Sequence, residues 1–298
     1  MNNSITVIST SYFSGEHLSR LFNNLLKKAE HKDSLQFLVI DNTNGSDDTL
    51  HDYLLDILHV KIILNDGRNL QRSISHSIAL DIGLKVSNSK FTLIIDPDVH
   101  IFKEKWDTLC VDFFQNNEKL VVGAPYPDWK LGKVHDYPSV VFIFFRTEQI
   151  KEFNKSFYPF PKIFIKIKNS IFRKITRLGF LSSKNRLDRS LFLRKITKRL
   201  EKSFGITSPD TGKDIIALCR DRLFKSINFK ACYPSMLENE RFNSSQYDMA
   251  KEFELYFYKE EPFMTHMYGS GVFHWKTING ANKNYWKKLI KKIEKEIK

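Results

Sequence analysis

Apolar runs alternate with amphipathic stretches over the first hundred residues. The runs predict buried strands, and the stretches between them carry apolar residues at helical spacing. Strands are expected at 5–10, 35–41, 60–64 and 91–96, with helices at about 18–26, 48–58 and 73–86. Strands that alternate with helices through short links predict βαβ units and a mostly parallel sheet with right-handed crossovers.

After Pro97 the pattern is less regular. We expect a helix at 106–115, strands at the start of 121–129 and over 139–145, two basic amphipathic helices within 160–204 separated by 179–190, a helix within 209–223, and a Lys-rich helix at 283–298. The first basic helix has an apolar face of Phe164, Ile167, Ile171, Ile175 and Leu178. The changes of pattern divide the chain into 1–150, 151–204, 205–282 and 283–298.

Polar residues follow each of the four early strands. These tips are Thr10 to Tyr12, Asp41 with Asn42, Asn65 with Asp66, and Asp96 with Asp98. Ligands bind outside the carboxyl ends of the strands in such sheets. The Asp96-Pro97-Asp98 pair is suited to Mg²⁺ or Mn²⁺, which would stabilise a diphosphate leaving group. The alternative is a pair of aspartates that only cap a turn.

Composition narrows the class of protein. A chain of 298 residues with 42% hydrophobic residues fits one large α/β unit with an insertion. The three cysteines are far apart and form no CxxC pair, which argues against a disulfide framework and a cysteine zinc site. With no recognisable signal peptide, we expect a cytoplasmic protein. The apolar runs are too short to cross a bilayer.

The net charge of +13 belongs to one segment. Residues 151–204 hold 16 Lys/Arg and 3 Asp/Glu, so the rest of the chain is neutral. We expect the amphipathic helices of 151–204 and of 283–298, the latter with Tyr285 and Trp286, to contact an anionic membrane surface as peripheral elements on its inner face. Their apolar faces could instead pack on the catalytic domain or form an oligomer.

Three segments together resemble the first blocks of family 2 glycosyltransferases, most closely the rhamnosyltransferase-like bacterial members. They are SYFSGEHL, LVIDNTNGSDDT and DIGLKVSNSKFTLIIDPDV, in that order. The resemblance implies a GT-A fold, which is an α/β nucleotide-sugar-binding sheet with helices on both faces. It implies an inverting, metal-dependent transfer from a nucleotide diphosphate sugar to a hydroxyl of a glycan or lipid-linked acceptor, in surface polysaccharide or glycolipid assembly. Residues 1–150 would then bind the donor and 205–282 the acceptor.

The resemblance also implies roles for the strand-tip residues. Tyr12, beside Thr10, would lie next to the base and ribose, and Asp41 would accept a hydrogen bond from the base. Asp98 would ligate Mn²⁺ or Mg²⁺, and Asp96 would bind the ribose or the water on the metal. Asp81 occupies a place where the family often has Asn, so it could simply cap its helix. Arg72 and His76 could face the donor phosphates.

The acceptor half offers a candidate base and a candidate third ligand. Asp210 in SPDTGKDI precedes a turn and a helix, so it is either the general base or only a helix cap. Asp214 and Glu238 are competitors. The segment THMYGSGVFHWKT resembles a late block that closes over the diphosphate, and it offers His266 first and His274 second as metal ligands. Either histidine could instead be a core residue.

Other functions fit the sequence less well. A sugar-phosphate nucleotidyltransferase would have a Gly-rich loop with Arg and Lys after the first strand, and SYFSGEHLSR has one glycine. An RNA-binding protein that used 151–204 would leave the aspartate-tipped sheet unexplained, and the segment has no nucleic-acid motif. The lack of G-x-G-x-x-G after the first strand argues against an NAD dehydrogenase.

Overall fold

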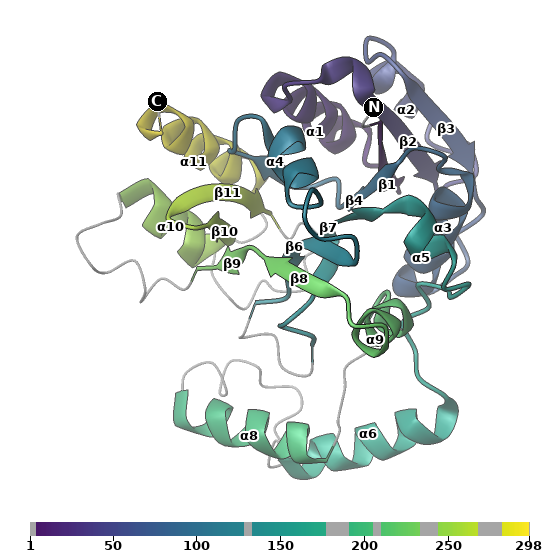
Figure 1. Ribbon diagram of the computed structural model, residues 1–298, viewed down its shortest axis with the longest axis vertical. Helices are drawn as coiled ribbons and strands as arrows, with labels where there is room; N and C mark the ends of the chain where they lie inside the picture. Colours follow the sequence, from purple (N-terminus) through teal and green to yellow (C-terminus); the bar gives the residue numbers. More distant parts are fainter. Residues whose placement is uncertain are drawn as a thin grey trace.

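A seven-stranded mixed sheet forms the centre of the protein in the computed structural model (Figure 1). The structure describes residues 4–127, 133–176, 191–204, 210–232, 244–267 and 282–297. Its order is β3 (Val60–Leu64), β2 (Leu35–Asp41), β1 (Ile5–Ser11), β4 (Phe91–Ile95), β7 (Pro138–Arg146), β6 (Leu120–Pro125) and β8 (Lys225–Asn228). The first four of these are parallel, as predicted, whereas β7 runs antiparallel to both β4 and β6. The carboxyl ends of the parallel strands therefore share one edge.

Helices cover both faces of this sheet, which confirms the expected α/β architecture. On one face pack α1 (Gly15–Lys28), α2 (Leu50–Leu54) and α4 (Trp106–Asp112), and on the other α3 (Arg72–Val86), α5 (Thr147–Lys151) and α9 (Lys213–Asp221). α2 is shorter than the predicted 48–58. A Cβ at Gly83 would lie 2.6 Å from Ile8 Cγ2, so glycine lets α3 approach β1 closely.

A second sheet, which the sequence pattern did not predict, adjoins the carboxyl edge of the first. Its order is β5 (Val99–Ile101), β11 (Glu261–His266), β10 (Glu254–Tyr258) and β9 (Lys230–Ala231). β5 starts directly after the Asp96-Pro97-Asp98 turn, and β11 runs antiparallel beside it. The second sheet therefore brings residues 254–266 to the end of β4.

The C-terminal helix α11 (Lys283–Glu296) is confirmed, but its apolar face packs into the protein. Trp286, Leu289, Ile290 and Ile293 are buried in a cluster with α10 (Ser244–Glu252) and the second sheet. The expectation that Trp286 lies at a membrane interface is therefore wrong, because this side chain is 0% exposed. The exposed face of α11 carries lysines, among them Lys288 and Lys291.

Both predicted basic helices are present as α6 (Ile163–Thr176) and α8 (Leu191–Ser203). They lie at one end of the long axis of the molecule, apart from both sheets, and extend in opposite directions from the place where they meet (Figure 1). The predicted connection at 179–190 lies outside the described residues. Within the described part of the chain, no helix has the length and apolar character that crossing a membrane requires.

Candidate metal and donor site

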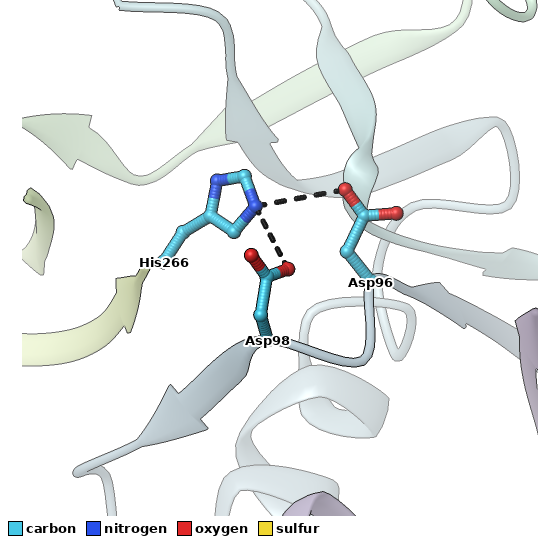
Figure 2. A group of neighbouring side chains, drawn as sticks. All are labelled: Asp96, Asp98 and His266. Atoms are coloured by element: carbon cyan, nitrogen blue, oxygen red, sulfur yellow. Dashed lines mark ion pairs between the residues drawn. The ribbon is translucent and has the colours of Figure 1, made fainter. Parts of the chain in front are cut away.

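Three potential metal ligands from distant parts of the chain meet where the two sheets join. Asp96 follows β4, Asp98 precedes β5, and His266 ends β11. Their ligand atoms all lie within 4.8 Å of one another. His266 Nε2 is 3.1 Å from Asp98 Oδ1 and 3.7 Å from Asp96 Oδ2 (Figure 2). The structure thus brings the first-choice histidine to the aspartate pair, whereas His274 lies outside the described residues.

The other ring nitrogen of His266 is held by Glu254, a residue that the sequence analysis missed. Glu254 and His266 face each other in the β10–β11 ladder, and Glu254 Oε2 lies 2.9 Å from Nδ1. Both side chains are buried. A carboxylate on one imidazole nitrogen fixes the ring and the tautomer, which leaves the other nitrogen for a metal.

The charge balance of the metal-free site depends on this histidine. Burial alone would lower the pKa of His266, but the carboxylates of Asp98 and Glu254 raise it to about 10. A protonated His266 offsets part of the negative charge of these carboxylates. A divalent cation between the three groups would take the place of the proton on Nε2, because only neutral imidazole ligates metals.

A buried arginine, which the sequence analysis also missed, donates hydrogen bonds to the backbone of the aspartate turn. Arg20 of α1 donates from Nη2 to the carbonyls of Val99 at 2.6 Å and Pro97 at 3.2 Å. Burial lowers the pKa of Arg20 to about 10, and the charge of Asp98 opposes that shift. The guanidinium therefore stays charged at neutral pH and fixes the backbone on both sides of Asp98.

Helix α11 supports both of the ligand-bearing segments. Arg20 Cζ lies over the ring of Trp286, 4.4 Å from the ring centroid. Trp286 Nε1 donates to Thr265 Oγ1 at 3.2 Å. His100, beside the turn, is 3.4 Å from Arg20 Nη1 and 3.2 Å from Glu294 of α11. Helix α11 thus supports residues next to the three ligands.

The Arg20→Lys variant tests this support while it keeps the positive charge. We expect the affinity for Mn²⁺ to fall about tenfold, because a lysine lacks the planar fork that holds two carbonyls at once. Manganese binding is measured by electron paramagnetic resonance, with Arg222→Lys on the exposed surface as the matched control. An Arg20→Lys protein that binds Mn²⁺ as tightly as the control would show that the turn does not need this support.

The predicted donor residues gather along the same edge, with different degrees of access. Tyr12 follows β1 and is 53% exposed. Thr10 is partly buried, and the next residue, Ser11, pairs with Asp41 of β2. Arg72 begins α3 and is exposed. His76, one turn further along α3, has its Nε2 3.7 Å from Asp96 Oδ1. His76 is therefore the residue that links α3 to the aspartate pair.

The carboxylate of Asp41 is largely occupied by its own turn. It accepts hydrogen bonds from Thr43 N at 2.9 Å, Thr43 Oγ1 at 2.7 Å and Gly45 N at 2.8 Å, and the side chain is buried. A carboxylate offers about four acceptor positions. About one acceptor position on Asp41 is therefore left for the contact with the base that the resemblance implied. The hydrogen bonds of this side chain shape the loop after β2.

The carboxylate of Asp81 binds the segment that precedes α6. Its carboxylate accepts hydrogen bonds from Ser156 Oγ and, at 2.8 Å, from Phe157 N, and burial raises its pKa. Asp81 lies in the third turn of α3, so it does not cap the start of that helix. In this structure it anchors the chain that leads into α6.

Asp210 is buried at the carboxyl edge and does not cap a helix. Gly212 is the N-cap of α9, and α9 has no side-chain cap. A Cβ at Gly212 would lie 3.9 Å from Val140 Cγ1 of β7, and the carbonyl of the next residue, Val141, accepts a bond from Asp96 N. The segment of Asp210 and the aspartate pair therefore lie at the same edge of the sheet. Burial raises the pKa of Asp210, and Lys133, 3.4 Å from Oδ1, counteracts this shift.

The two competitors of Asp210 differ in what the structure says of them. Asp214 is an exposed residue of α9 that forms an ion pair with Lys213 at 2.6 Å. Because its carboxylate is exposed and already paired with a lysine, Asp214 is the weaker candidate. Glu238 lies outside the described residues.

Comparison with known proteins gives one family and several distant structures. A sequence model described as glycosyl transferase family 2 matches residues 6–175. No curated protein matches the chain. S. aureus TarS 1–349 is 18% identical, with a TM-score of 0.38, over 52% of this chain and 50% of TarS 1–349, so the chain spans about half the length of that structure. The mannosyltransferase PcManGT from Pyrobaculum calidifontis, solved with GDP-Man and Mn²⁺, is 12% identical, with a TM-score of 0.42, over 75% of this chain and 80% of that one.

Proposed function

The chain belongs to glycosyl transferase family 2, and we propose that it moves a sugar from a nucleotide diphosphate sugar to a hydroxyl acceptor, with inversion at the anomeric carbon. The observation that carries this proposal is the meeting of Asp96, Asp98 and His266 at the carboxyl edge of the sheet. The nucleotide-sugar specificity, the inversion and the role in surface-glycan assembly are parts of the proposal.

Mn²⁺ or Mg²⁺ suits the ligands at this site. Two carboxylates supply hard oxygen atoms, and the single imidazole favours Mn²⁺ over Mg²⁺. When bound, such an ion offers its remaining positions to diphosphate oxygens and so stabilises the leaving group. Glu254 and Arg20 hold the ligands in place from behind, which supports a preformed site.

The residues around the metal ligands are suited to the donor. The exposed ring of Tyr12 offers a surface on which the base and ribose can pack, and Thr10 and Asp41 border it. The positive end of the α3 dipole, with Arg72 at its first residue and His76 one turn later, favours the diphosphate. Asp96 has His76 on one side and His266 on the other.

Asp210 is the proposed general base. Attack on the anomeric carbon from the side opposite to the leaving diphosphate requires a group that takes the proton of the acceptor hydroxyl. A carboxylate whose pKa burial raises holds a proton better than a solvated one, and Asp210 meets this requirement. Lys133 keeps the carboxylate ionised before the acceptor arrives.

We further propose a glycan or lipid-linked acceptor, reached at the inner face of a membrane. The basic segment 151–204 leaves the catalytic unit next to Asp210, since Asp210 N bonds to Pro159 O and Gly212 N to Phe157 O. A segment that contacts an anionic membrane would therefore lie next to the proposed acceptor site. This placement supports an acceptor that is itself attached to the membrane.

A panel of nucleotide diphosphate sugars tests the proposed activity. We expect one of them to be hydrolysed slowly to the nucleoside diphosphate and free sugar when Mn²⁺ is present, and the loss of hydrolysis in EDTA. Nucleoside diphosphate release is measured with a coupled assay, and pyrophosphate release from a nucleoside triphosphate with a sugar phosphate is measured beside it. Pyrophosphate release without donor hydrolysis would indicate a nucleotidyltransferase instead.

A further inference from the structure

Polar side chains are buried on helices α6 and α8, which contact each other. Four polar residues of the pair, from both helices, are only 2–4% exposed: Asn169, Thr176, Thr197 and Glu201. Thr197 Oγ1 of α8 donates to the Thr176 carbonyl of α6 at 3.3 Å. An aromatic pair, Phe172 with Phe204, accompanies these polar groups, with ring centroids 5.0 Å apart. An ordinary helix pair in water buries its apolar stripe, whereas most of the apolar stripe of α6 is left outside this contact.

Four apolar side chains on one face of α6 are exposed. Phe164 is 82% exposed, Ile167 52%, Ile171 54% and Ile175 60%. With about 100° of rotation per residue, these four form one stripe on the side of the helix opposite Asn169 and Thr176. A continuous apolar stripe that a soluble domain leaves uncovered marks a surface for a partner.

Basic side chains border this stripe. Lys168 and Lys174 are exposed, and the same helical geometry places one on each side of the apolar residues. On α8, Phe192 is 71% exposed and the basic Lys195 and Arg199 are exposed too. An apolar stripe with lysines along both borders is the pattern of a helix that lies in a lipid–water interface.

We propose that the outer face of the α6–α8 pair docks onto an anionic lipid bilayer, with α6 lying in the plane of the interface and its apolar stripe among the acyl chains. A 14-residue helix is about 21 Å long, so α6 lies on the membrane and does not cross it. A second copy of the chain is a poorer occupant, since it would bring two faces of the same strong positive charge together. A nucleic acid would neutralise the lysines and leave the stripe in water.

The α6–α8 pair is attached to the rest of the protein next to Asp210, the proposed general base. Both ends of the segment that carries α6 and α8 meet at Asp210, through the bonds of Phe157 and Pro159 with residues 210–212. Docking through α6 therefore brings the acceptor side of the protein to the membrane. The inference depends on the α6–α8 surface alone and stands or falls apart from the donor site.

The Ile167→Asp/Ile171→Asp variant tests the proposal by sedimentation with vesicles. The wild-type protein is expected to sediment with phosphatidylglycerol–phosphatidylcholine vesicles, and much less with phosphatidylcholine alone or in about 1 M salt, where the screening length falls to about 3 Å. The variant should partition at least about tenfold more weakly. The matched control is Leu55→Asp/Leu58→Asp, which adds the same charge at side chains that are 81% and 71% exposed.

All four substituted residues are exposed, so folding is expected to survive, and circular dichroism together with donor binding verifies this. The proposal is overturned if the α6 variant binds anionic vesicles as well as the control does, or if the wild-type protein binds neither kind of vesicle. It is also overturned if sedimentation velocity finds a dimer that the α6 variant dissociates while vesicle binding is absent, or if RNA binds and vesicles do not.

Discussion

The Asp98→Asn variant is expected to lose sugar transfer by about a thousandfold. Asp98 is the aspartate nearest to His266 Nε2. Its backbone is fixed by Arg20, which binds the carbonyls on both sides, and by Met267 N, which donates to the Asp98 carbonyl at 2.9 Å. An amide keeps the size of the side chain but removes the negative charge that a divalent cation requires. Loss of the ion leaves the diphosphate to depart without its counter-charge, and one such electrostatic contact is worth about 10²–10³ in rate.

The measurement compares transfer or donor hydrolysis with the affinity for Mn²⁺ in the same preparations. Asp107→Asn is the control, because Asp107 is also buried and accepts bonds from Glu30 N and His31 N, far from the metal ligands along α4. It is expected to lose stability and keep its affinity for Mn²⁺. Equal Mn²⁺ binding by Asp98→Asn and the wild-type protein would remove Asp98 from the metal site.

Asp210→Asn is the second large effect, and it should separate binding from chemistry. We expect transfer to fall by about 10²–10⁴, the range in which a general base contributes, while affinity for the donor and for Mn²⁺ stays within about twofold. The raised pKa of Asp210 also sets the sign of the pH dependence. The base acts only when ionised, so kcat/KM falls as the pH drops through this pKa.

Asp214→Asn serves as the control for Asp210, because it lies four residues further on and is exposed and paired with Lys213. It should transfer sugar like the wild-type protein. A large loss in Asp214→Asn with normal Asp210→Asn activity would exchange the two roles. Loss of donor binding in Asp210→Asn would move Asp210 to the donor side.

Most of the catalytic framework could be predicted because it is encoded locally. Each early strand is a short apolar run, and the polar residues after it must lie at the shared edge of a parallel sheet. Asp96 and Asp98 were therefore placed correctly from their position after the fourth run. The second sheet was missed because β9 has two residues, β5 has three, and β10 and β11 show no clean alternation of apolar and polar side chains.

The supporting residues escaped prediction because their roles come from contacts across the fold. Arg20 looks like a surface residue of an amphipathic helix, yet its guanidinium reaches the carbonyls of Pro97 and Val99. Glu254 could have been found only from a β10–β11 hairpin that pairs it with His266. Asp41 and Asp81 were predicted to contact the donor, with a helix cap as the alternative for Asp81. The structure shows that both carboxylates bind nearby segments of the fold, and no sequence pattern specifies these partners.

Amphipathic periodicity identified α6, α8 and α11 but not the direction of their apolar faces. The same pattern turns inward in α11, where Trp286 is fully buried, and outward in α6, where Phe164 is exposed. The difference lies in what packs beside each helix. The second sheet and α10 give α11 an apolar surface to pack on, whereas the contact of α6 with α8 leaves the stripe that contains Phe164 uncovered.

Isothermal titration of the wild-type protein and Asp98→Asn with UDP- and GDP-sugars, in Mn²⁺ and in EDTA, tests the central claim most directly. The claim is that Asp96, Asp98 and His266 hold the cation through which a nucleotide diphosphate sugar binds. We predict that one nucleotide sugar binds the wild-type protein in Mn²⁺, and that binding weakens at least about tenfold in EDTA and in Asp98→Asn. Binding of no nucleotide sugar in Mn²⁺, or equally tight binding to Asp98→Asn, would contradict it.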